Sequence, residues 1–441
     1  MKTLYTFPPF HEHRLANGLK MVYIPDDEQN ALTMAIQIPH GRFCDEQGVE
    51  GLAELTVGLL QKGCAGRSTN EFARAIEYHG ASFYGEVNDE FIIIGFKSLE
   101  KFADTIIDLF WQMIVTPAFF PEELKRLKRE AITVLQSEQA DAMSVATRHF
   151  YAQLFGSIHP AGRQNTSASI KKITLESIRT FHKQRITPRE SVLVIAGAFN
   201  FESYQSRYEP MFASWQVAAA PNSASVAPAA ALTQTRIRLL HKADLTQTSL
   251  IVGHGAPGEA APERNALSLA NYILGGGNFS SRLMEKIRTA TGKTYGISSQ
   301  VASGRMFGAF MITTATRNEQ LSEVLASIVQ VYRQLAADGI TDNELERAKK
   351  YTIGNMAFQL EGIGNIVDKI LWLHFFGRHK SYIEQFGQMI ASLTSAEINR
   401  SIRAHLSSPY FIICAAGNAP AIEGVLANYG LVERVGYRSL L

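Results

Sequence analysis

Cysteine is scarce in this chain of 441 residues. Cys44, Cys64 and Cys414 are the three present, they lie far apart, and none belongs to a C-x-x-C or mixed Cys/His pattern. This spacing supports neither a zinc ribbon nor a disulfide framework. Ser/His/Asp and Cys/His groupings are missing as well, so a homodimeric enzyme with unrelated nucleophilic chemistry has no support. We expect the thiols to be buried or incidental.

An excess of charge and a long apolar run are also missing. The formal net charge is +2, which gives no reason to expect nucleic acid or an anionic membrane as a partner. No apolar run approaches the length of a membrane span, and the first residues, MKTLYTFPPFHEHRL, contain no apolar signal core. These features predict an ordinary globular protein of the cytoplasm, or of the periplasm if a leader has been removed.

The length of the chain predicts more than one domain, because it exceeds a single typical core. Residues 216–232, QVAAAPNSASVAPAAAL, are rich in Ala, Pro and Ser and carry no charge. Such a change in composition is typical of an interdomain linker. The sequence therefore predicts an N-terminal domain over 1–215, a linker over 216–232 and a C-terminal domain over 233–441.

The two halves show a similar order of elements. In the first half, hydrophobic periodicity predicts strands over 19–24, 31–38, 81–95 (two strands around Asn88-Asp89) and 191–197, and helices after Gly48 and over 70–78, 99–115, 121–139, 142–155 and 175–184. In the second half it predicts strands over 237–240, 249–253, 295–301 and 307–314, and helices over 262–274 and 321–335.

A short segment also recurs. Glu123-Leu124 followed by Arg126 returns as Glu344-Leu345 followed by Arg347, about 220 residues later, and such self-similarity favours duplication over chance. The predicted fold class is therefore α+β, with two homologous domains, each a mostly antiparallel β-sheet covered by helices.

The stretch Leu274–Ser298, LGGGNFSSRLMEKIRTATGKTYGIS, is the best local candidate for a site. Gly275–Gly277 allow a tight bend or a close approach to another surface. Ser280 or Ser281 can cap a helix that ends near Gly292, just before a strand. Arg288 and Tyr295 then flank one helix-to-strand turn, and a guanidinium and a phenol are good donors to a carbonyl oxygen or its oxyanion. The alternative is a solvated arginine and an amphipathic edge tyrosine.

A second stretch, Gly51–Leu55 at the start of a helix, resembles the inverted zinc motif H-x-x-E-H of the pitrilysin/insulinase-type metallopeptidases. The motif histidines would fall on Gly51 and Leu55, which cannot bind zinc, and Glu54 alone keeps its type. The third ligand of the family, a glutamate, would fall near 131–134, where no carboxylate occurs and Glu130 is the nearest. The resemblance thus implies no metal ligand in this chain, and it leaves open whether Glu54 or Glu130 keeps a role.

The resemblance extends over nearly the whole chain, including Asn17-Gly18-Leu19, His159-Pro160 and the duplicated halves. His159 is a tempting ligand, but we expect His-Pro to shape a turn. The Arg/Tyr pair of the family matches Arg288 and Tyr295, with Ser281-Arg282-Leu283 upstream as in relatives.

The resemblance to bacterial heterodimers of the mitochondrial-processing-peptidase type implies a division of labour. The predicted function is a non-zinc subunit that supplies Arg288 and Tyr295 for binding and oxyanion stabilisation of a peptide or unfolded protein. A homologous partner subunit would carry the zinc, so that this chain alone is inactive. The alternative is a non-catalytic structural or peptide-binding protein of the same fold, like the core subunits of respiratory complexes.

Overall fold

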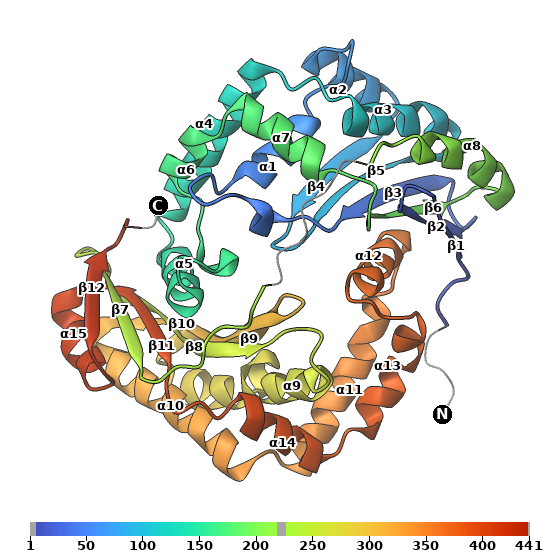
Figure 1. Cartoon of the computed structure of the whole chain (residues 1–441). Coiled ribbons are helices and arrows are strands. Elements are labelled where there is room, and N and C mark those ends of the chain that lie inside the picture. Colours follow the sequence, from blue (N-terminus) through green and yellow to red (C-terminus); the bar gives the residue numbers. More distant parts are fainter. Residues whose placement is uncertain (1–5, 218–225, 440–441) are drawn as a thin grey trace.

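The structure, a computed structural model, describes residues 6–217 and 226–439. Its two halves lie opposite each other, and each is built around one six-stranded sheet (Figure 1). The first sheet contains β1 (His11–Arg14), β2 (Lys20–Pro25), β3 (Ala31–Ile38), β4 (Ser82–Val87), β5 (Ile92–Leu99) and β6 (Val192–Gly197). The second contains β7 (Arg236–His241), β8 (Gln247–Pro257), β9 (Thr294–Ser303), β10 (Phe307–Arg317), β11 (Ile412–Gly417) and β12 (Val432–Gly436).

The two sheets share one topology. Their spatial orders are β1-β2-β6-β3-β5-β4 and β12-β7-β11-β8-β10-β9. Strand β2 pairs with β6, and β7 with β11, in parallel, whereas the pairs from there to the far edge are antiparallel. The edge strand beyond β2 and β7 differs between the two sheets. In the first sheet it is β1, the first strand of its half, and in the second sheet it is β12, the last strand of its half. The predicted α+β fold of two homologous halves is confirmed.

The helices also follow the same order in both halves. Those of the first half are α1 (Leu52–Leu60), α2 (Thr69–Tyr78), α3 (Ala103–Val115), α4 (Pro121–Glu138), α5 (Ala142–Phe155), α6 (Ser167–Lys172), α7 (Leu175–Arg185) and α8 (Phe201–Ala213). Those of the second half are α9 (Arg264–Asn271), α10 (Leu321–Asp338), α11 (Asp342–Phe358), α12 (Ile363–Phe375), α13 (Ser381–Ser392), α14 (Ser395–His405) and α15 (Ala419–Ala427). The recurring Glu-Leu-x-Arg segments begin α4 and α11, which are equivalent elements.

Strand β6 shows how each sheet is covered on both faces. Its six residues are all buried. Leu193 and Ile195 belong to the core of the first half, whereas Val192, Val194 and Ala196 point to the other face and pack in a separate cluster. Because side chains alternate along a strand, an entirely apolar strand is expected only where both faces are covered.

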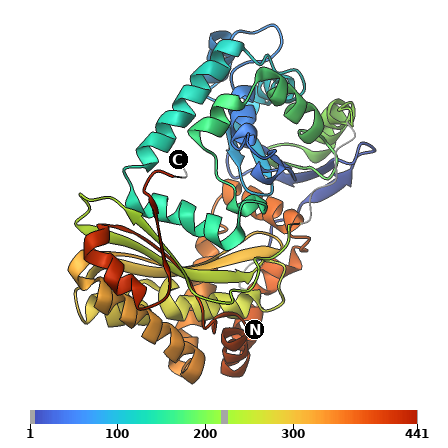
Figure 2. The same ribbon diagram turned by 60° about the vertical axis from the view of Figure 1, so that its left-hand side comes forward.

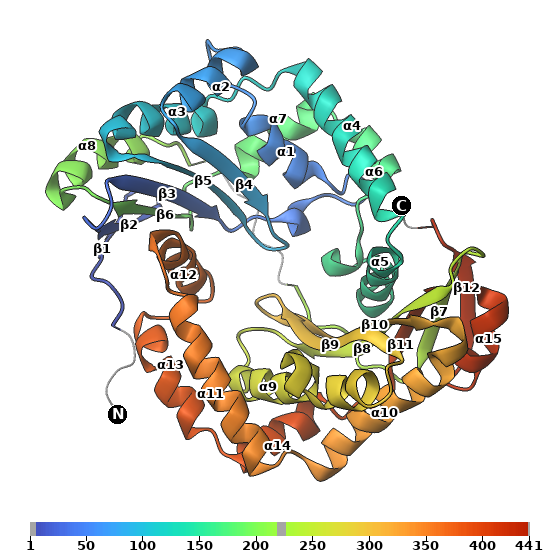
Figure 3. The ribbon, with the colours of Figure 1, turned by 180° about the vertical axis from the view of Figure 1, so that it is seen from behind.

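The cover on the second face comes from the other half of the chain. Helix α12 packs across β3 and β6 of the first sheet (Figures 1 and 3), and α5 packs across β8 and β11 of the second (Figure 2). The predicted cover of helices is present on both sheets. Which half supplies each helix was not predicted, because periodicity shows that a helix has an apolar side and not which sheet receives it.

Part of the predicted linker falls outside the described residues, namely 218–225. Residues 226–232 contain no helix or strand, and the imidazole Nε2 of His159 lies 2.7 Å from the Ala227 carbonyl oxygen, to which it donates. The boundaries at 215 and 233 stay predictions. Among the described residues, no helix combines the length and hydropathy needed to cross a bilayer.

Candidate functional site

The start of α1, where the family motif falls without its histidines, is built around a buried aspartate. The Asp45 carboxylate accepts hydrogen bonds from the backbone N–H groups of Gly51 (2.8 Å), Leu52 (3.1 Å) and Ala53 (2.9 Å). It therefore satisfies donors that a helix N-terminus leaves unpaired. Burial and the neighbouring Glu54 raise the pKa of Asp45 to about 7. The three hydrogen bonds favour the carboxylate and oppose this rise, but they do not outweigh it.

The two histidine positions of the family motif have other functions here. Gly51 adopts a φ of 103°, in the left-handed region, and a Cβ there would lie 3.3 Å from Ile170. Leu55 is buried in the core of the first half. A histidine at 51 would be strained and one at 55 would enter an apolar core, so neither position is free to hold a metal.

Glu54 is paired with an arginine. Its carboxylate lies 3.4 Å from the Arg42 guanidinium, which also lies 3.3 Å from the Asp89 carboxylate. Burial raises the pKa of Glu54, and Arg42 opposes that rise. The surrounding pocket of about 310 Å³ is lined by residues of the first half, including Arg148 and Arg163.

The other ligand candidates are also engaged elsewhere. Glu130 is half-exposed and forms a 2.5 Å ion pair with Arg126, one turn earlier on α4. His159 accepts a hydrogen bond of 3.0 Å from the Ala161 N–H through Nδ1 and so caps the short helix η3 (Pro160–Gly162), as expected of a turn-shaping residue. In residues 6–217 and 226–439, no group of three or more His, Cys, Asp and Glu side chains is placed to hold a metal ion. These residues do not fit a zinc ion.

The glycine-rich stretch of the second half packs closely against its neighbours. A Cβ on Gly275 would lie 2.6 Å from the Ser299 hydroxyl on β9, and one on Gly277 would lie 2.8 Å from the Tyr272 carbonyl oxygen. The glycines therefore serve the predicted close approach. The left-handed turn falls instead on Asn278, with a φ of 49°.

Helix geometry around this stretch differs from the prediction. Two wider π-helical segments, η4 (Tyr272–Gly276) and η6 (Met284–Thr289), flank the short helix η5 (Asn278–Ser280). Ser280 and Ser281 donate their hydroxyls to the carbonyls of Gly277 and Asn278. Ser281 stands at the predicted N-cap position, with an extended backbone and a carbonyl that accepts from the Glu285 N–H (2.9 Å). Its hydroxyl, like that of Ser280, stabilises the preceding turn instead of capping the helix. The predicted helix end is confirmed, since the Gly292 N–H donates to the Arg288 carbonyl (2.8 Å) at a φ of 64°.

The two predicted site residues lie together. The Arg288 guanidinium lies over the Tyr295 ring at 5.5 Å from its centroid, and over the Phe279 ring at 4.7 Å. The Tyr295 side chain is 92% exposed. Within residues 6–217 and 226–439, the Arg288 guanidinium makes no hydrogen bond or ion pair, so its N–H donors face solvent or a ligand.

Arg282, on the same segment, provides a contrast. Its guanidinium binds Glu344 on α11 through two bonds of 2.6 and 2.7 Å, and it also donates to the Gly339 carbonyl (2.9 Å). Burial alone would raise the pKa of Glu344. The hydrogen bonds from Arg282 and Thr341 outweigh that effect and lower the pKa to about 2. Arg282 thus has a structural role, while the donors of Arg288 stay free.

A β-bulge includes Tyr295, which lies on the edge strand of the sheet. Ile297 pairs with Thr314 and Thr294 with Thr316, so Tyr295 and Gly296 together oppose one residue of β10. The Thr294 hydroxyl donates to the Ala315 carbonyl (2.8 Å), and the Thr314 hydroxyl donates to that of Gly296 (2.9 Å). Bulges reorient side chains, and they are common at sheet edges and next to active sites.

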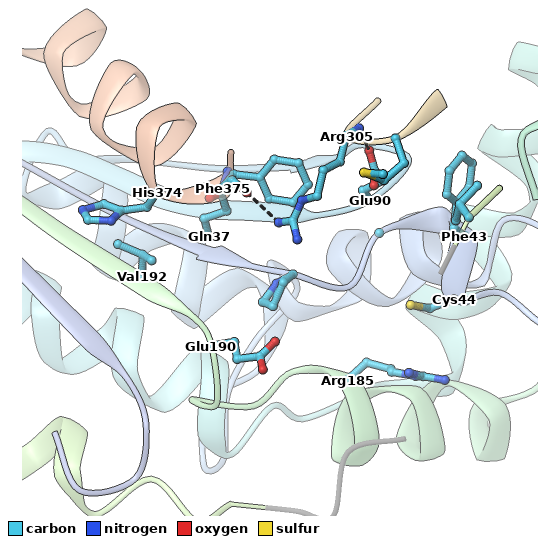
Figure 4. A pocket seen from close by; sticks show the side chains of 14 residues that line it. Gln37, Phe43, Cys44, Glu90, Arg185, Glu190, Val192, Arg305, His374 and Phe375 are labelled. Carbon is cyan, nitrogen blue, oxygen red and sulfur yellow. Dashed lines mark hydrogen bonds between the residues drawn. The ribbon is translucent and has the colours of Figure 1, made fainter. Parts of the chain in front are cut away.

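One pocket between the two halves is lined by residues that connect them (Figure 4). It has a volume of about 480 Å³, and neither Arg288 nor Tyr295 lines it. Arg305, in the β9–β10 turn, donates to the Phe375 carbonyl (2.6 Å) and covers the Phe375 ring at 4.3 Å. Its backbone N–H donates to the Glu90 carboxylate (2.6 Å). These contacts connect the turn to both α12 and the first half.

Sequence reasoning missed three contributors to these sites: Asp45, Phe279 and the Thr294/Thr314 pair. Phe279 stands directly after the glycine run and Asn278, which was a usable signal for an exposed turn residue. Asp45 precedes its helix by several residues and gives no capping pattern. The threonine pair joins two strands, and a single sequence does not show that register.

The comparisons with known proteins agree with this arrangement. Residues 20–164 match the family described as insulinase (peptidase family M16), and residues 172–351 match the peptidase M16 inactive domain. An uncharacterized zinc protease of Mycobacterium leprae is 26% identical over 90% of this chain and 89% of its own length. A non-peptidase homolog of Helicobacter pylori is 24% identical over 80% of this chain and 82% of its own length.

Solved structures show the same fold. The peptidase M16 inactive domain from Pseudomonas fluorescens superimposes with a TM-score of 0.85 at 24% identity, covering 93% of this chain and 98% of that one. A putative M16-like peptidase from Alicyclobacillus acidocaldarius gives a TM-score of 0.79 at 17% identity. With both halves matched in sequence and in fold, and with Gly51 and Leu55 at the motif positions, the chain belongs to the insulinase (pitrilysin) family as an inactive member.

Proposed function

We propose that this chain is the non-zinc subunit of a heterodimeric metallopeptidase. A homologous partner carries the zinc, and this chain supplies Arg288 and Tyr295 to a peptide or an unfolded protein. The observation that carries the proposal is the unengaged Arg288 guanidinium beside an exposed phenol, in a chain whose own α1 offers no metal ligand. The pocket at α1 is lined by the first half alone, so the Arg/Tyr pair has no metal centre to serve within its own chain.

The chemistry of this chain in the reaction is hydrogen-bond donation. The zinc, bound in the partner, supplies an activated water. Arg288 and Tyr295 donate to the scissile carbonyl oxygen and to the oxyanion that develops from it. Removing one comparable donor costs about 3–4 kcal/mol of transition-state stabilisation in other enzymes.

The edge of the second sheet offers a way to hold the peptide. Strand β9 is at the end of the sheet order and pairs with β10. Its Ser299 and Val301 carbonyls accept hydrogen bonds from Asn271 (3.2 Å) and Arg264 (3.4 Å) of α9, so an added strand would pair with the part of β9 nearer Tyr295. Peptide addition through main-chain hydrogen bonds gives affinity with weak sequence preference. Tyr295 lies at the start of this edge, which would bring the added peptide close to both donors.

Reconstitution tests the proposal. The purified chain is mixed with a homologue from the same genome that retains H-x-x-E-H, and cleavage of a fluorogenic peptide library is followed. We expect cleavage in the mixture and not by this chain alone, with kcat reduced about 10²–10³-fold by Arg288→Ala and less by Tyr295→Phe. Lys286→Ala, an exposed cation on the same segment, serves as the matched control and should keep full activity. Chelator-sensitive cleavage by this chain alone would reject the proposal.

A second candidate is a structural or peptide-binding protein without a part in catalysis. It is favoured by the Helicobacter pylori relative that is called a non-peptidase homolog, and it explains the missing ligands equally well. Peptide binding by this chain that leaves the turnover of every zinc-bearing homologue unchanged would support it over the first.

A further inference from the structure

The Arg288 guanidinium contacts two aromatic rings, and one of them belongs to a residue that the family pair does not include. The guanidinium carbon is 4.7 Å from the centroid of Phe279 and 5.5 Å from that of Tyr295. Both distances are within the range of cation–π attraction. Phe279 precedes Arg288 in the chain and Tyr295 follows it, so the two rings reach the cation from separate elements, η5 and β9.

Aromatic contacts restrain a guanidinium without using its donors. The five N–H groups of arginine lie in the guanidinium plane, whereas a ring covers its face. A carboxylate partner would occupy those donors, as Glu344 does with Arg282. Arg288 is therefore restrained in a way that keeps its hydrogen-bonding capacity for a carbonyl oxygen.

The backbone at Phe279 is held in a defined turn. Phe279 follows Asn278, whose φ of 49° turns the chain, and the hydroxyls of Ser280 and Ser281 close that turn with bonds of 2.9 and 2.8 Å. Ser281 is fully buried. The Phe279 side chain is 67% exposed, so it contributes little to the core and can be replaced without unfolding the domain.

We propose that Phe279 is a positioning residue of the reaction, acting through Arg288. Its ring holds the guanidinium beside the Tyr295 phenol, so that both groups donate to the same carbonyl oxygen of the peptide. This inference rests on the proposed function, while the geometry it describes belongs to the isolated chain and is measurable there.

The first test is NMR of the arginine Nε–H groups in the isolated, ¹⁵N-arginine-labelled chain. Nearby rings displace the Arg288 resonance from the ordinary arginine position, and Arg288→Lys identifies it by removing it. Phe279→Ala and Phe279→Leu should move the resonance toward the ordinary position, whereas Phe279→Tyr should keep it displaced. Phe358→Ala, which removes a similarly exposed phenylalanine on α11, should leave it unchanged.

The second test uses the reconstituted mixture. Phe279→Ala and Phe279→Leu should lower kcat by about two- to five-fold, the equivalent of one exposed cation–π contact. Phe279→Tyr, which keeps an aromatic ring, should have the kcat of the unmodified chain. The melting temperature of the isolated chain should not change. In an Arg288→Ala background the Phe279 substitution should have no further effect on kcat, because the ring acts through that side chain.

The outcomes separate the two proposals. A resonance that depends on Phe279, in a chain that activates no partner, rejects the proposed function and keeps the aromatic restraint of Arg288. An active mixture that needs Arg288 but whose kcat ignores Phe279→Ala and Phe279→Leu rejects the positioning role. An Arg288 resonance unaffected by Phe279→Ala also overturns it.

Discussion

Arg282 and Arg288 stand on one short segment and have opposite relations to the fold. Arg282 is held by Glu344 and by the Gly339 carbonyl, and its side chain is 23% exposed. Arg282→Ala would leave a largely buried carboxylate without its partner, so we expect a loss of about 1–3 kcal/mol in the free energy of unfolding. Arg288→Ala should change it by less than about 0.5 kcal/mol. Urea denaturation of both variants checks this, and equal losses would contradict the assigned roles.

The same ion pair gives the chain an acid-sensitive contribution. The pKa of Glu344 falls from 4.5 to about 2 on folding. A depressed pKa means that the contribution is complete above about pH 4.5 and is lost as the pH falls toward 2. The Glu344→Gln variant should be less stable at pH 7, on the order of 2–3 kcal/mol, and the gap should narrow by pH 3. Urea titrations at both values check this; a constant gap would contradict it.

At the residue scale, the sequence predicted which residues are candidates for the site better than it predicted what those residues contact. The spacing of Arg288 and Tyr295 and the loss of donors at 51 and 55 were readable directly. The partners Asp45, Phe279 and Glu344 were not, because each contact depends on where another element packs. The left-handed φ at Gly51 was equally hidden, and it explains why this glycine shapes the helix start.

At the element scale, the bulge of β9 depends on two buried hydroxyls. The hydroxyl oxygens of Thr294 and Thr314 lie 2.7 Å apart, and both hydroxyls form hydrogen bonds with backbone carbonyls. Thr294→Val or Thr314→Val leaves buried polar groups unpaired, so each should lower the free energy of unfolding by about 1–3 kcal/mol. The double variant should lose less than the sum, since the two sites share partners. A double-mutant cycle measures this, and full additivity would contradict the coupling.

Regular elements were predicted well where apolar residues repeat every second residue, or every third to fourth. Strands β3, β6 and β10 and helices α4, α5 and α10 fall where that pattern placed them. The π-helical segments η4 and η6 were predicted as ordinary helix. Their widened turns arise where the glycine-rich stretch meets β9, which is a tertiary effect that local periodicity does not carry. Elements after residue 358 were not predicted.

At the scale of the whole molecule, each half contributes one helix to the sheet of the other half, α5 to the second sheet and α12 to the first. This exchange of helices should make the two halves unfold together. Phe150 on α5 is fully buried among residues of the second sheet, so Phe150→Ala should lower stability by about 3–5 kcal/mol. Calorimetry should show one transition in the native chain, with matching calorimetric and van't Hoff enthalpies. Two resolved transitions in the unmodified chain would contradict this.

The order of predicted elements indicated that the two halves are duplicates. It did not indicate that each half covers the sheet of the other with one helix. Helices α5 and α12 each show an apolar side, and which sheet they cover depends on packing between halves. This interlocking also supports a view of the chain as one body. Any closure around a peptide would then occur between this chain and a partner, and not between its own two halves.

Metal analysis of the isolated chain, and of the complex it forms with a zinc-bearing homologue, tests the central claim most directly. The chain is purified alone and with the homologue, and zinc is quantified per polypeptide alongside peptide cleavage. The division of labour predicts a zinc-free chain, a complex with zinc in the partner, and cleavage that needs Arg288. Stoichiometric zinc bound by this chain in its own first half would contradict it.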